Sequence, residues 1–201
     1  MKYTVVNLIN LINEIGETET KSVLSNFNCS LAPDVEEFIR EKAVDFSQRG
    51  WAQTHLVFTM RKKDLVLVGY FTLALKIITV PAGNISKSVQ KRISSFSTYD
   101  MAIDAYCLSA PLIAQLGKNF QNNYNTLITG SDLLTIACDK VSSIMQDLGG
   151  RFTYIECEDK PALIDFYKRN GFFEFDRRTL NPKEKGLFSS QYLVQMLRHI
   201  K

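Results

Sequence analysis

The sequence has few of the side chains that build metal sites and disulfide frameworks. It contains only two histidines, His55 and His199, and neither has a second ligand at metal-binding spacing. Its cysteines are far apart and form no Cys-x-x-Cys pair: Cys29, Cys107, Cys138 and Cys157. Zinc sites and disulfide-rich secreted domains depend on such pairs, so we predict no metal and reduced, buried thiols in a cytoplasmic protein.

Long apolar runs are also missing. Asn7, Asn10 and Asn13 interrupt the apolar N-terminus, which argues against a signal peptide. No stretch is apolar enough over the length of a membrane span, so no membrane partner is expected. The net charge of +3 is small; it permits an anionic ligand without indicating nucleic acid. The 201 residues include 45% hydrophobic residues and show no linker or repeat, which predicts a single domain over residues 1–201.

The first half of the sequence predicts helices followed by a hairpin. Apolar residues at helical spacing predict a helix over residues 4–16, whereas residues 21–27 fit a helix end or a strand equally well. A second helix is expected after Pro33, because Asp34 and Glu37 have the spacing of a capping box. Residues 51–60 and 65–80 then predict two antiparallel strands.

Two features interrupt the regular pattern of this region. Gly69 lies inside the second predicted strand, which indicates a bulge or a close approach of another backbone. Residues 81–99 are polar and include a short basic helix expected over residues 86–93. Its charges are typical of a solvated helix face, and a binding surface is the alternative.

The second half alternates strands and helices. The expected elements are a central strand (106–118), an Asn-rich loop (119–125), a regular helix from Gly130 to Leu148, a buried strand (152–157), a short helix (160–169) and two closing strands (173–179 and 191–197). A strand, a helix and a second strand in succession favour a parallel pair within a mixed sheet. The helix at 160–169 is expected to begin with Asp159 as cap and Pro161 in its first turn, and to end at Gly171.

The end of this short helix carries a recognisable motif. Phe166-Tyr167-x-x-x-Gly171-Phe172 resembles the C-terminal half of the GNAT N-acetyltransferase superfamily, in which the tyrosine points at the sulfur of acetyl-coenzyme A. Residues 34–43 and 68–74 resemble the branch that includes the acetyltransferase toxins of bacterial toxin–antitoxin pairs and phage-borne relatives. The resemblance touches most of residues 34–175. It implies an α/β (α+β) fold: a mixed, mostly antiparallel sheet with a central splayed parallel strand pair and helices on both faces.

The resemblance also implies acetyl-coenzyme A (acetyl-CoA) as co-substrate. In the family its pyrophosphate lies at the N-terminus of the long helix, where free N–H groups and the helix dipole attract an anion. The cofactor-binding residues implied here are Lys118, Phe120, Asn125, Ile128, Thr129, Gly130, Ser131, Asp159 and Tyr167. A plain helix cap is the alternative role for Asp159.

The pyrophosphate loop departs from the family pattern. The motif Gln/Arg-x-x-Gly-x-Gly/Ala falls on residues 125–130, where only Gly130 is kept. Asn125 replaces the Gln or Arg, and Ile128 replaces a glycine. A β-branched residue tolerates positive φ poorly, so the loop is expected to follow another path. Asp132 also brings a negative charge close to this region and offers nothing to a phosphate.

The resemblance implies that an amine attacks the thioester directly in a ternary complex, with Tyr167 as the acid that protonates the leaving thiolate. An ordinary phenol pKa of about 10 keeps Tyr167 protonated at neutral pH. No general base is evident among Glu156, Glu158 and His55. The α-amine of an aminoacyl-tRNA has a low pKa and needs no strong base.

These residues leave several functions open. An acetyl-CoA-dependent N-acetyltransferase acting on a primary amine is favoured. The alternatives are a catalytically impaired GNAT-fold binding protein and a toxin-type enzyme acting on aminoacyl-tRNA, with an antitoxin as partner. A tRNA partner requires basic residues gathered on one face. The candidates are Arg61, Lys62, Lys63, Lys91, Arg92, Lys168, Arg169, Arg177 and Arg178. The acceptor stays unidentified, and a homodimer is left open.

Overall fold

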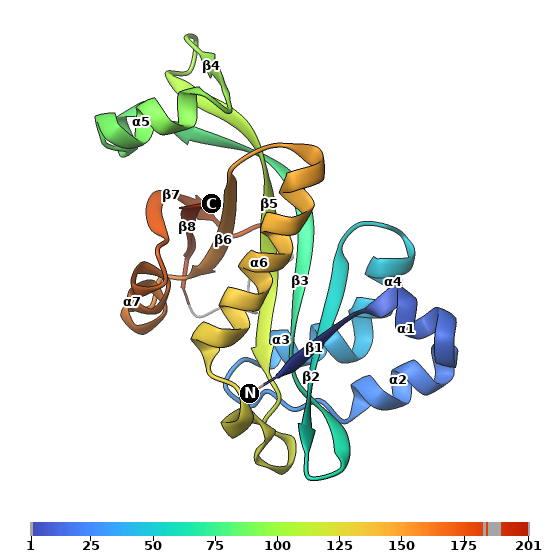
Figure 1. The fold of residues 1–201 in the computed structure, drawn as a ribbon. Helices are drawn as coiled ribbons and strands as arrows, with labels where there is room; N and C mark the ends of the chain where they lie inside the picture. Colours follow the sequence, from blue (N-terminus) through green and yellow to red (C-terminus); the bar gives the residue numbers. More distant parts are fainter. Residues whose placement is uncertain (1, 183, 185–189, 201) are drawn as a thin grey trace. The chain divides into compact units, whose positions relative to one another are not determined.

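A long antiparallel hairpin forms the middle of the N-terminal half in the computed structural model, as predicted (Figure 1). It consists of β2 (Gln53–Arg61) and β3 (Asp64–Pro81), both rich in β-branched and aromatic residues. The register shifts between Val57 and Phe58, opposite Gly69, so the predicted bulge is present. A Cβ on Gly69 would also lie 2.9 Å from the carbonyl oxygen of Gly117. Both explanations for this glycine are therefore correct.

The structure describes residues 2–182, 184 and 190–200. Before the hairpin lie β1 (Tyr3–Asn7), α1 (Leu8–Ile15), α2 (Glu17–Ser25), α3 (Pro33–Glu37), the π-helix η1 (Phe38–Lys42) and α4 (Ala43–Gln48). After it come η2 (Ala82–Asn84), α5 (Lys87–Ser94), β4 (Thr98–Asp100), β5 (Ala105–Lys118), η3 (Gln121–Leu127), α6 (Gly130–Leu148), β6 (Phe152–Glu158), α7 (Pro161–Arg169), β7 (Phe173–Thr179) and β8 (Tyr192–His199).

The strands form one mixed, mostly antiparallel sheet in the order β1-β2-β3-β5-β6-β8-β7, with β4 paired to β5. β5 and β6 are the parallel pair, with Leu112 opposite Tyr154. The fold class predicted from the sequence is therefore confirmed. No described helix has the length and apolar character needed to cross a membrane.

The chain's contacts fall into two compact units. The first comprises Met1–Ala74 and Ile113–Ala137, and the second comprises Leu75–Leu112 and Cys138–Lys201. In the first unit, side chains from α1–α4 pack against β2 and β3 in a core that includes Leu24, Ile39, Leu56 and Tyr70. A Cβ on Gly69 would lie on the opposite face of β3, 3.1 Å from Cδ2 of Leu133 in α6. Helices therefore cover both faces of this part of the sheet, as expected.

The second unit has a core of its own. Residues of α5 and its approach, including Ile85 and Ile93, pack with Phe152 and Tyr154 of β6 and with Phe175 of β7. The predicted basic helix is confirmed as α5, which is capped by the Ser86 hydroxyl accepting from the N–H of Val89. β6 is almost fully buried, as predicted for a strand covered on both faces.

Two local predictions near the N-terminus are wrong. Residues 4–7 form a strand rather than a helix, because β1 pairs with the edge of β2 and Asn7 caps α1 through the N–H of Ile9. Asp34 and Glu37 form no capping box: α3 begins at Pro33, and its N-cap residue, Ala32, has no side chain that could cap. The ambiguous segment at 21–27 is mostly helical, in α2.

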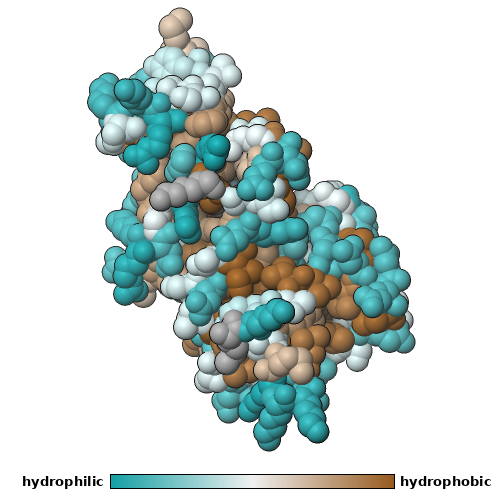
Figure 2. All heavy atoms as spheres, viewed as in Figure 1, coloured by the Kyte–Doolittle hydropathy of each residue, from teal (hydrophilic) through white to brown (hydrophobic). Residues whose placement is uncertain are grey.

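At one end of the first unit, the turn between β2 and β3 lies close to η3 and to the start of β1 (Figure 1). Hydrophilic residues gather at this end of the surface, at the bottom of the view in Figure 2. Arg61, Lys62 and Lys63 are all exposed here.

Candidate functional site

α7 ends in a Schellman motif, and this explains the spacing Tyr-x-x-x-Gly-Phe. The N–H of Phe172 donates to the carbonyl of Tyr167 (3.1 Å), and the N–H of Gly171 donates to that of Lys168 (3.0 Å). Gly171 has a φ of 83°, the left-handed conformation that this motif requires. The rings of Tyr167 and Phe172 lie 5.7 Å apart, which supplies the apolar contact that accompanies the motif. The predicted glycine stop is confirmed, and it holds the ring of Tyr167 in place.

Gly171 offers a direct test of this helix end. A Cβ there would lie 3.7 Å from Nε of Arg198, an ordinary contact, so a substitution is penalised by its backbone conformation. Gly171→Ala is expected to lower the free energy of unfolding by about 1–2 kcal/mol, and Gly171→Asn by less, because Asn adopts the left-handed region more readily. Urea denaturation measures both. Equal losses for the two variants would contradict this explanation.

The side chain of Tyr167 is half-buried, and its ring also contacts Phe166 at 5.0 Å. Within the described residues its hydroxyl has no hydrogen-bond partner. Burial raises the pKa of Tyr167 above its ordinary value, and the nearby thiols of Cys157 and Cys138 add to the rise. The phenol therefore keeps its proton at neutral pH and has a donor to spare.

The two thiols near Tyr167 are not nucleophiles. Burial raises the pKa of Cys138 to about 11 and that of Cys157 to about 12, so both stay protonated at neutral pH. Cys138 instead accepts a hydrogen bond from Nη1 of Arg198 at 3.2 Å. The guanidinium of Arg198 lies 5.8 Å from the ring of Phe172.

The side chains considered as general bases are all engaged in other contacts. Glu156 lies on the opposite face of β6 from Cys157, and it accepts from Nε of Arg178 and Nε2 of Gln195, both at 2.8 Å. Glu158 forms an ion pair with Lys160. His55 is buried on β2 and stacks on Phe71 at 4.9 Å.

Asp159 does not cap α7 as predicted. The N-cap residue is Lys160, one position later, and it makes no side-chain cap bond; Pro161 occupies the first turn as expected. The carboxylate of Asp159 accepts instead from Nη1 of Arg177 at 2.6 Å, a charge-assisted bond that a neutral backbone N–H does not match. A contact between Asp159 and the cofactor remains a prediction.

In the first unit, the loop after β5 brings together several residues that the resemblance implies for the cofactor. Nζ of Lys118 donates to the carbonyl of Asn125 (3.1 Å) and lies 5.9 Å from the ring of Phe120. The N–H of Phe120 donates to the carbonyl of Asn28 at 2.7 Å. The backbone of Phe120 and the ammonium of Lys118 are therefore already engaged in holding the loop.

The loop takes another path than the glycine motif, as predicted from Ile128. That residue is extended, with φ −146°, and its side chain is 2% exposed. The left-handed residues are Asn122 and Asn123, with φ of 49° and 60°. Asn tolerates this region better than other non-glycine residues. The Asn-rich composition thus places the turn upstream of the motif position.

The N-terminus of α6 is closed by its own side chains. Thr129 Oγ1 accepts from the N–H of Asp132 at 3.0 Å, and the Asp132 carboxylate accepts from the N–H of Thr129 at 3.2 Å. Hydrogen bonds from the hydroxyl and the N–H of Thr129 lower the pKa of Asp132, so its charge is present at neutral pH. This reciprocal pair is a capping box, which the Thr-x-x-Asp spacing could have revealed.

This end of α6 therefore does not fit a pyrophosphate in the way the resemblance implies. Asp132 already occupies the positive end of the helix dipole. In the first turn, only the N–H groups of Gly130 and Ser131 have no hydrogen-bond acceptor among the described residues. A phosphate placed there would meet a carboxylate.

The basic residues considered for tRNA binding differ in whether they already form ion pairs within the protein. Arg177 pairs with Asp159 and Glu174, and Arg178 pairs with Glu156 and Glu184. The remaining candidates form no ion pair with any residue that the structure describes: Arg61, Lys62, Lys63, Lys91, Arg92, Lys168 and Arg169.

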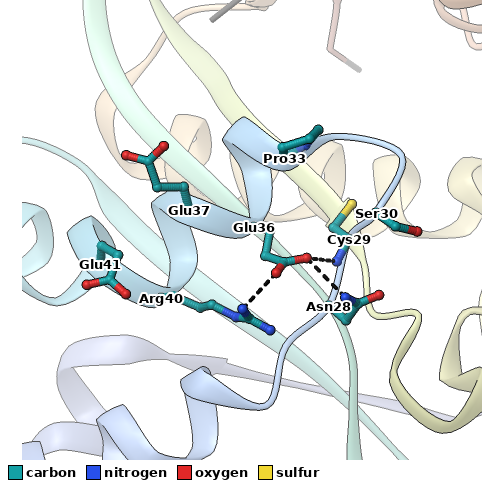
Figure 3. A pocket seen from close by; sticks show the side chains of 8 residues that line it. All are labelled: Asn28, Cys29, Ser30, Pro33, Glu36, Glu37, Arg40 and Glu41. Atoms are coloured by element: carbon teal, nitrogen blue, oxygen red, sulfur yellow. Dashed lines mark hydrogen bonds and ion pairs between the residues drawn. The ribbon is translucent and has the colours of Figure 1, made fainter.

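The first unit also contains a pocket of about 490 Å³. It is lined by Asn28, Cys29, Ser30, Pro33, Glu36, Glu37, Arg40 and Glu41 (Figure 3). Glu36 accepts from the N–H of Cys29 (2.6 Å) and pairs with Arg40 (2.7 Å), and these groups point toward one another in Figure 3. Glu37 pairs with Lys42 at 2.6 Å, while the carboxylate of Glu41 adds negative charge, so this pocket does not suit the phosphates of CoA.

No protein-family model and no curated protein matches this sequence. Solved structures do match its fold. AtaT complexed with acetyl-methionyl-tRNAfMet superposes with a TM-score of 0.62 at 16% identity, over 96% of this chain and 94% of AtaT. This is the fold of the AtaT toxin. A tyrosine-to-phenylalanine mutant of KacT gives 0.61 at 14% identity, over 96% and 94% of the two chains.

AtaTR bound with acetyl-CoA gives a TM-score of 0.56 at 13% identity, over 98% of this chain and 93% of the other. At such identities the likeness to AtaT and KacT is one of fold. It agrees with the resemblance drawn from residues 34–43, 68–74 and 166–172.

Proposed function

We propose that this protein transfers the acetyl group of acetyl-CoA to a primary amine by direct attack in a ternary complex. The observation that carries the proposal is Tyr167: its ring is held at the end of α7, and its hydroxyl has no hydrogen-bond partner among the described residues. Fold alone does not decide function, but the shared fold with AtaTR, solved with acetyl-CoA, supports the choice of co-substrate.

In this proposal the acceptor nitrogen bonds to the thioester carbonyl carbon, and the C–S bond breaks. Tyr167 donates its phenolic proton to the leaving thiolate, the acceptor nitrogen loses a proton to solvent, and the tyrosinate regains a proton from solvent before the next turnover. The contribution of the protein is to align the reactants and to supply this proton. The cofactor contacts implied for Lys118, Phe120, Asn125, Ile128, Thr129, Gly130, Ser131 and Asp159 belong to the same proposal, with the pyrophosphate itself placed outside the start of α6 that Asp132 closes.

A thermal-shift titration with acetyl-CoA, CoA and ATP tests the proposal. A ligand at a hundredfold excess over its Kd stabilises the folded state by about 2.7 kcal/mol, which corresponds to roughly 5–11 °C in Tm for a chain of this size. We expect such shifts with both CoA ligands and little with ATP. No shift at millimolar acetyl-CoA would favour the alternative, a binding protein on this fold whose cofactor loop is closed by Asp132.

The α-amine of aminoacyl-tRNA is a second candidate acceptor. It is favoured by the likeness to AtaT solved with acetyl-methionyl-tRNAfMet and by cations without an ion pair in the described residues, such as Lys91 and Arg92, both exposed. We expect label from acetyl-CoA to enter charged tRNA and to leave it when the aminoacyl ester is hydrolysed at alkaline pH. Equal labelling of uncharged tRNA would contradict this acceptor.

An antitoxin-like protein partner and a homodimer are further proposals, to be tested by co-purification and light scattering.

The raised pKa of Tyr167 predicts the pH dependence of turnover. A raised pKa means that the phenol holds its proton to higher pH than a free tyrosine, whose pKa is about 10. Loss of this proton is therefore expected to cause no fall in kcat below about pH 10. A kcat profile from pH 6 to 10 measures this. A fall near pH 8–9 that disappears in Tyr167→Phe would show that the phenol ionises earlier than expected.

A further inference from the structure

The turn between β2 and β3 brings a cation against the loop that precedes α6. Nη1 of Arg61 donates to the carbonyl of Asn122 at 2.8 Å, and the guanidinium lies 5.2 Å from the ring centre of Tyr124. These contacts join residues about sixty positions apart in the sequence. They hold an otherwise long and flexible side chain in one place, beside the loop that corresponds to the pyrophosphate loop of the resemblance.

Most of the hydrogen-bonding capacity of Arg61 is left over. A guanidinium carries five N–H donors, and only one is used within the described residues. The residue is exposed, and no carboxylate in the described part of the chain pairs with it. Lys62 and Lys63 follow it in the turn between β2 and β3, and both are exposed. Arginine forks match phosphate oxygens in geometry, and the neighbouring charges strengthen the attraction.

Tyr3, at the start of β1, places Asp132 at the same end of the first unit as Arg61. The hydroxyl of Tyr3 donates to the carbonyl of Leu127 at 2.9 Å. Burial raises the pKa of Tyr3, and the negative charge of Asp132 adds to the rise. Tyr3 is also opposite Thr59, two residues before Arg61 on β2. An available cation and a helix start closed by a carboxylate therefore lie in one region of the first unit.

We propose that Arg61, assisted by Lys62 and Lys63, binds the phosphate groups of CoA in place of the α6 N-terminus, and that Asp132 weakens this binding. The inference rests on the proposed function. It accounts for the missing Gln or Arg at Asn125 and the missing glycine at Ile128: the positive charge comes from a hairpin turn instead of the motif. It assigns opposite effects to Arg61 and Asp132, so variants of the two residues test it in opposite directions.

The experiment is calorimetric titration of the full chain with CoA and with pantetheine, which lacks the phosphates. Arg61→Ala is expected to weaken CoA binding about ten- to a hundredfold, the range for hydrogen bonds to charged groups. Arg61→Lys should weaken CoA binding less, because lysine keeps the positive charge and loses only the paired donors of the guanidinium. Asp132→Asn should tighten CoA binding about two- to fivefold. Pantetheine affinity should not change in any of them.

Arg151→Ala is the matched control, since Arg151 is an exposed arginine immediately before β6 without an ion pair in the described residues. It should bind CoA as the wild type does. Tm values for all variants show whether the fold survives. If Arg61→Ala falls too far in stability, Arg61→Lys and Asp132→Asn still carry the test.

The possible failures are distinguishable. A wild-type protein that binds no CoA overturns the proposed function together with this inference. Wild-type binding with no loss in Arg61→Ala overturns the inference alone, as does an equal loss for CoA and pantetheine. If Arg61→Ala binds CoA normally but binds tRNA more weakly, the phosphates that Arg61 contacts belong to RNA, and the assignment to CoA is wrong.

Discussion

Replacing Tyr167 with phenylalanine is expected to reduce kcat for acetyl transfer about a hundred- to ten-thousandfold, the usual contribution of a positioned general acid. The substitution removes only the hydroxyl, which makes no hydrogen bond within the described residues. The ring contact with Phe172 is kept. Stability and the Kd for acetyl-CoA should therefore stay close to the wild type, so that the loss appears in kcat rather than in folding.

Tyr192→Phe is the matched control, because Tyr192 is 44% exposed on β8 and its hydroxyl has no described partner. It should leave kcat unchanged. If expression of the wild type arrests growth, Tyr167→Phe should relieve the arrest and Tyr192→Phe should not. Full activity in Tyr167→Phe would remove the acid role, and transfer would then depend on positioning alone.

Gly117→Ala is expected to destabilise the first unit through a clash in its core. A Cβ on Gly117 would overlap Cγ1 of Val35 and lie 3.3 Å from Cε1 of Tyr70. Both neighbours are buried, and the Tyr70 hydroxyl donates to the carbonyl of Val35 at 2.6 Å. Neither can move without disturbing this buried bond, so the added methyl should cost about 1–3 kcal/mol.

The control for this substitution is Gly83→Ala, since a Cβ on Gly83 would meet nothing within 4 Å. Thermal denaturation should show a fall of roughly 2–12 °C for Gly117→Ala and almost no change for Gly83→Ala. If both variants have the Tm of the wild type, β5 and α3 are less closely packed around Gly117 than they are in the structure.

Much of the fold could be predicted because its signals are local. The hairpin of β2 and β3, the regular helix α6 and the glycine stop of α7 each depend on residues within one strand or one or two helical turns. The motif at Tyr167 is local for the same reason: the Schellman bonds join residues only a few positions apart. Ile128 likewise predicted a changed loop path from its own φ preference.

The errors have a common physical cause. Residues 4–7 lie in a segment with helical spacing, yet they pair as a strand because the edge of β2 offers backbone partners. Asp159 was expected at a helix N-terminus, but Arg177 from β7 provides a stronger partner. In each case a group distant in sequence competes successfully with the local preference.

The sequence by itself therefore determined the order of the elements, the motif that ends α7 and the residue proposed as acid. Only the tertiary structure decided what surrounds them. It places Arg61 against Asn122 and Tyr124, closes the start of α6 with Asp132 in a region that Tyr3 also reaches, and engages Glu156 with Arg178. Helix ends and turns are governed by neighbours along the chain, whereas the charge and free donors of a site depend on side chains that meet only after folding.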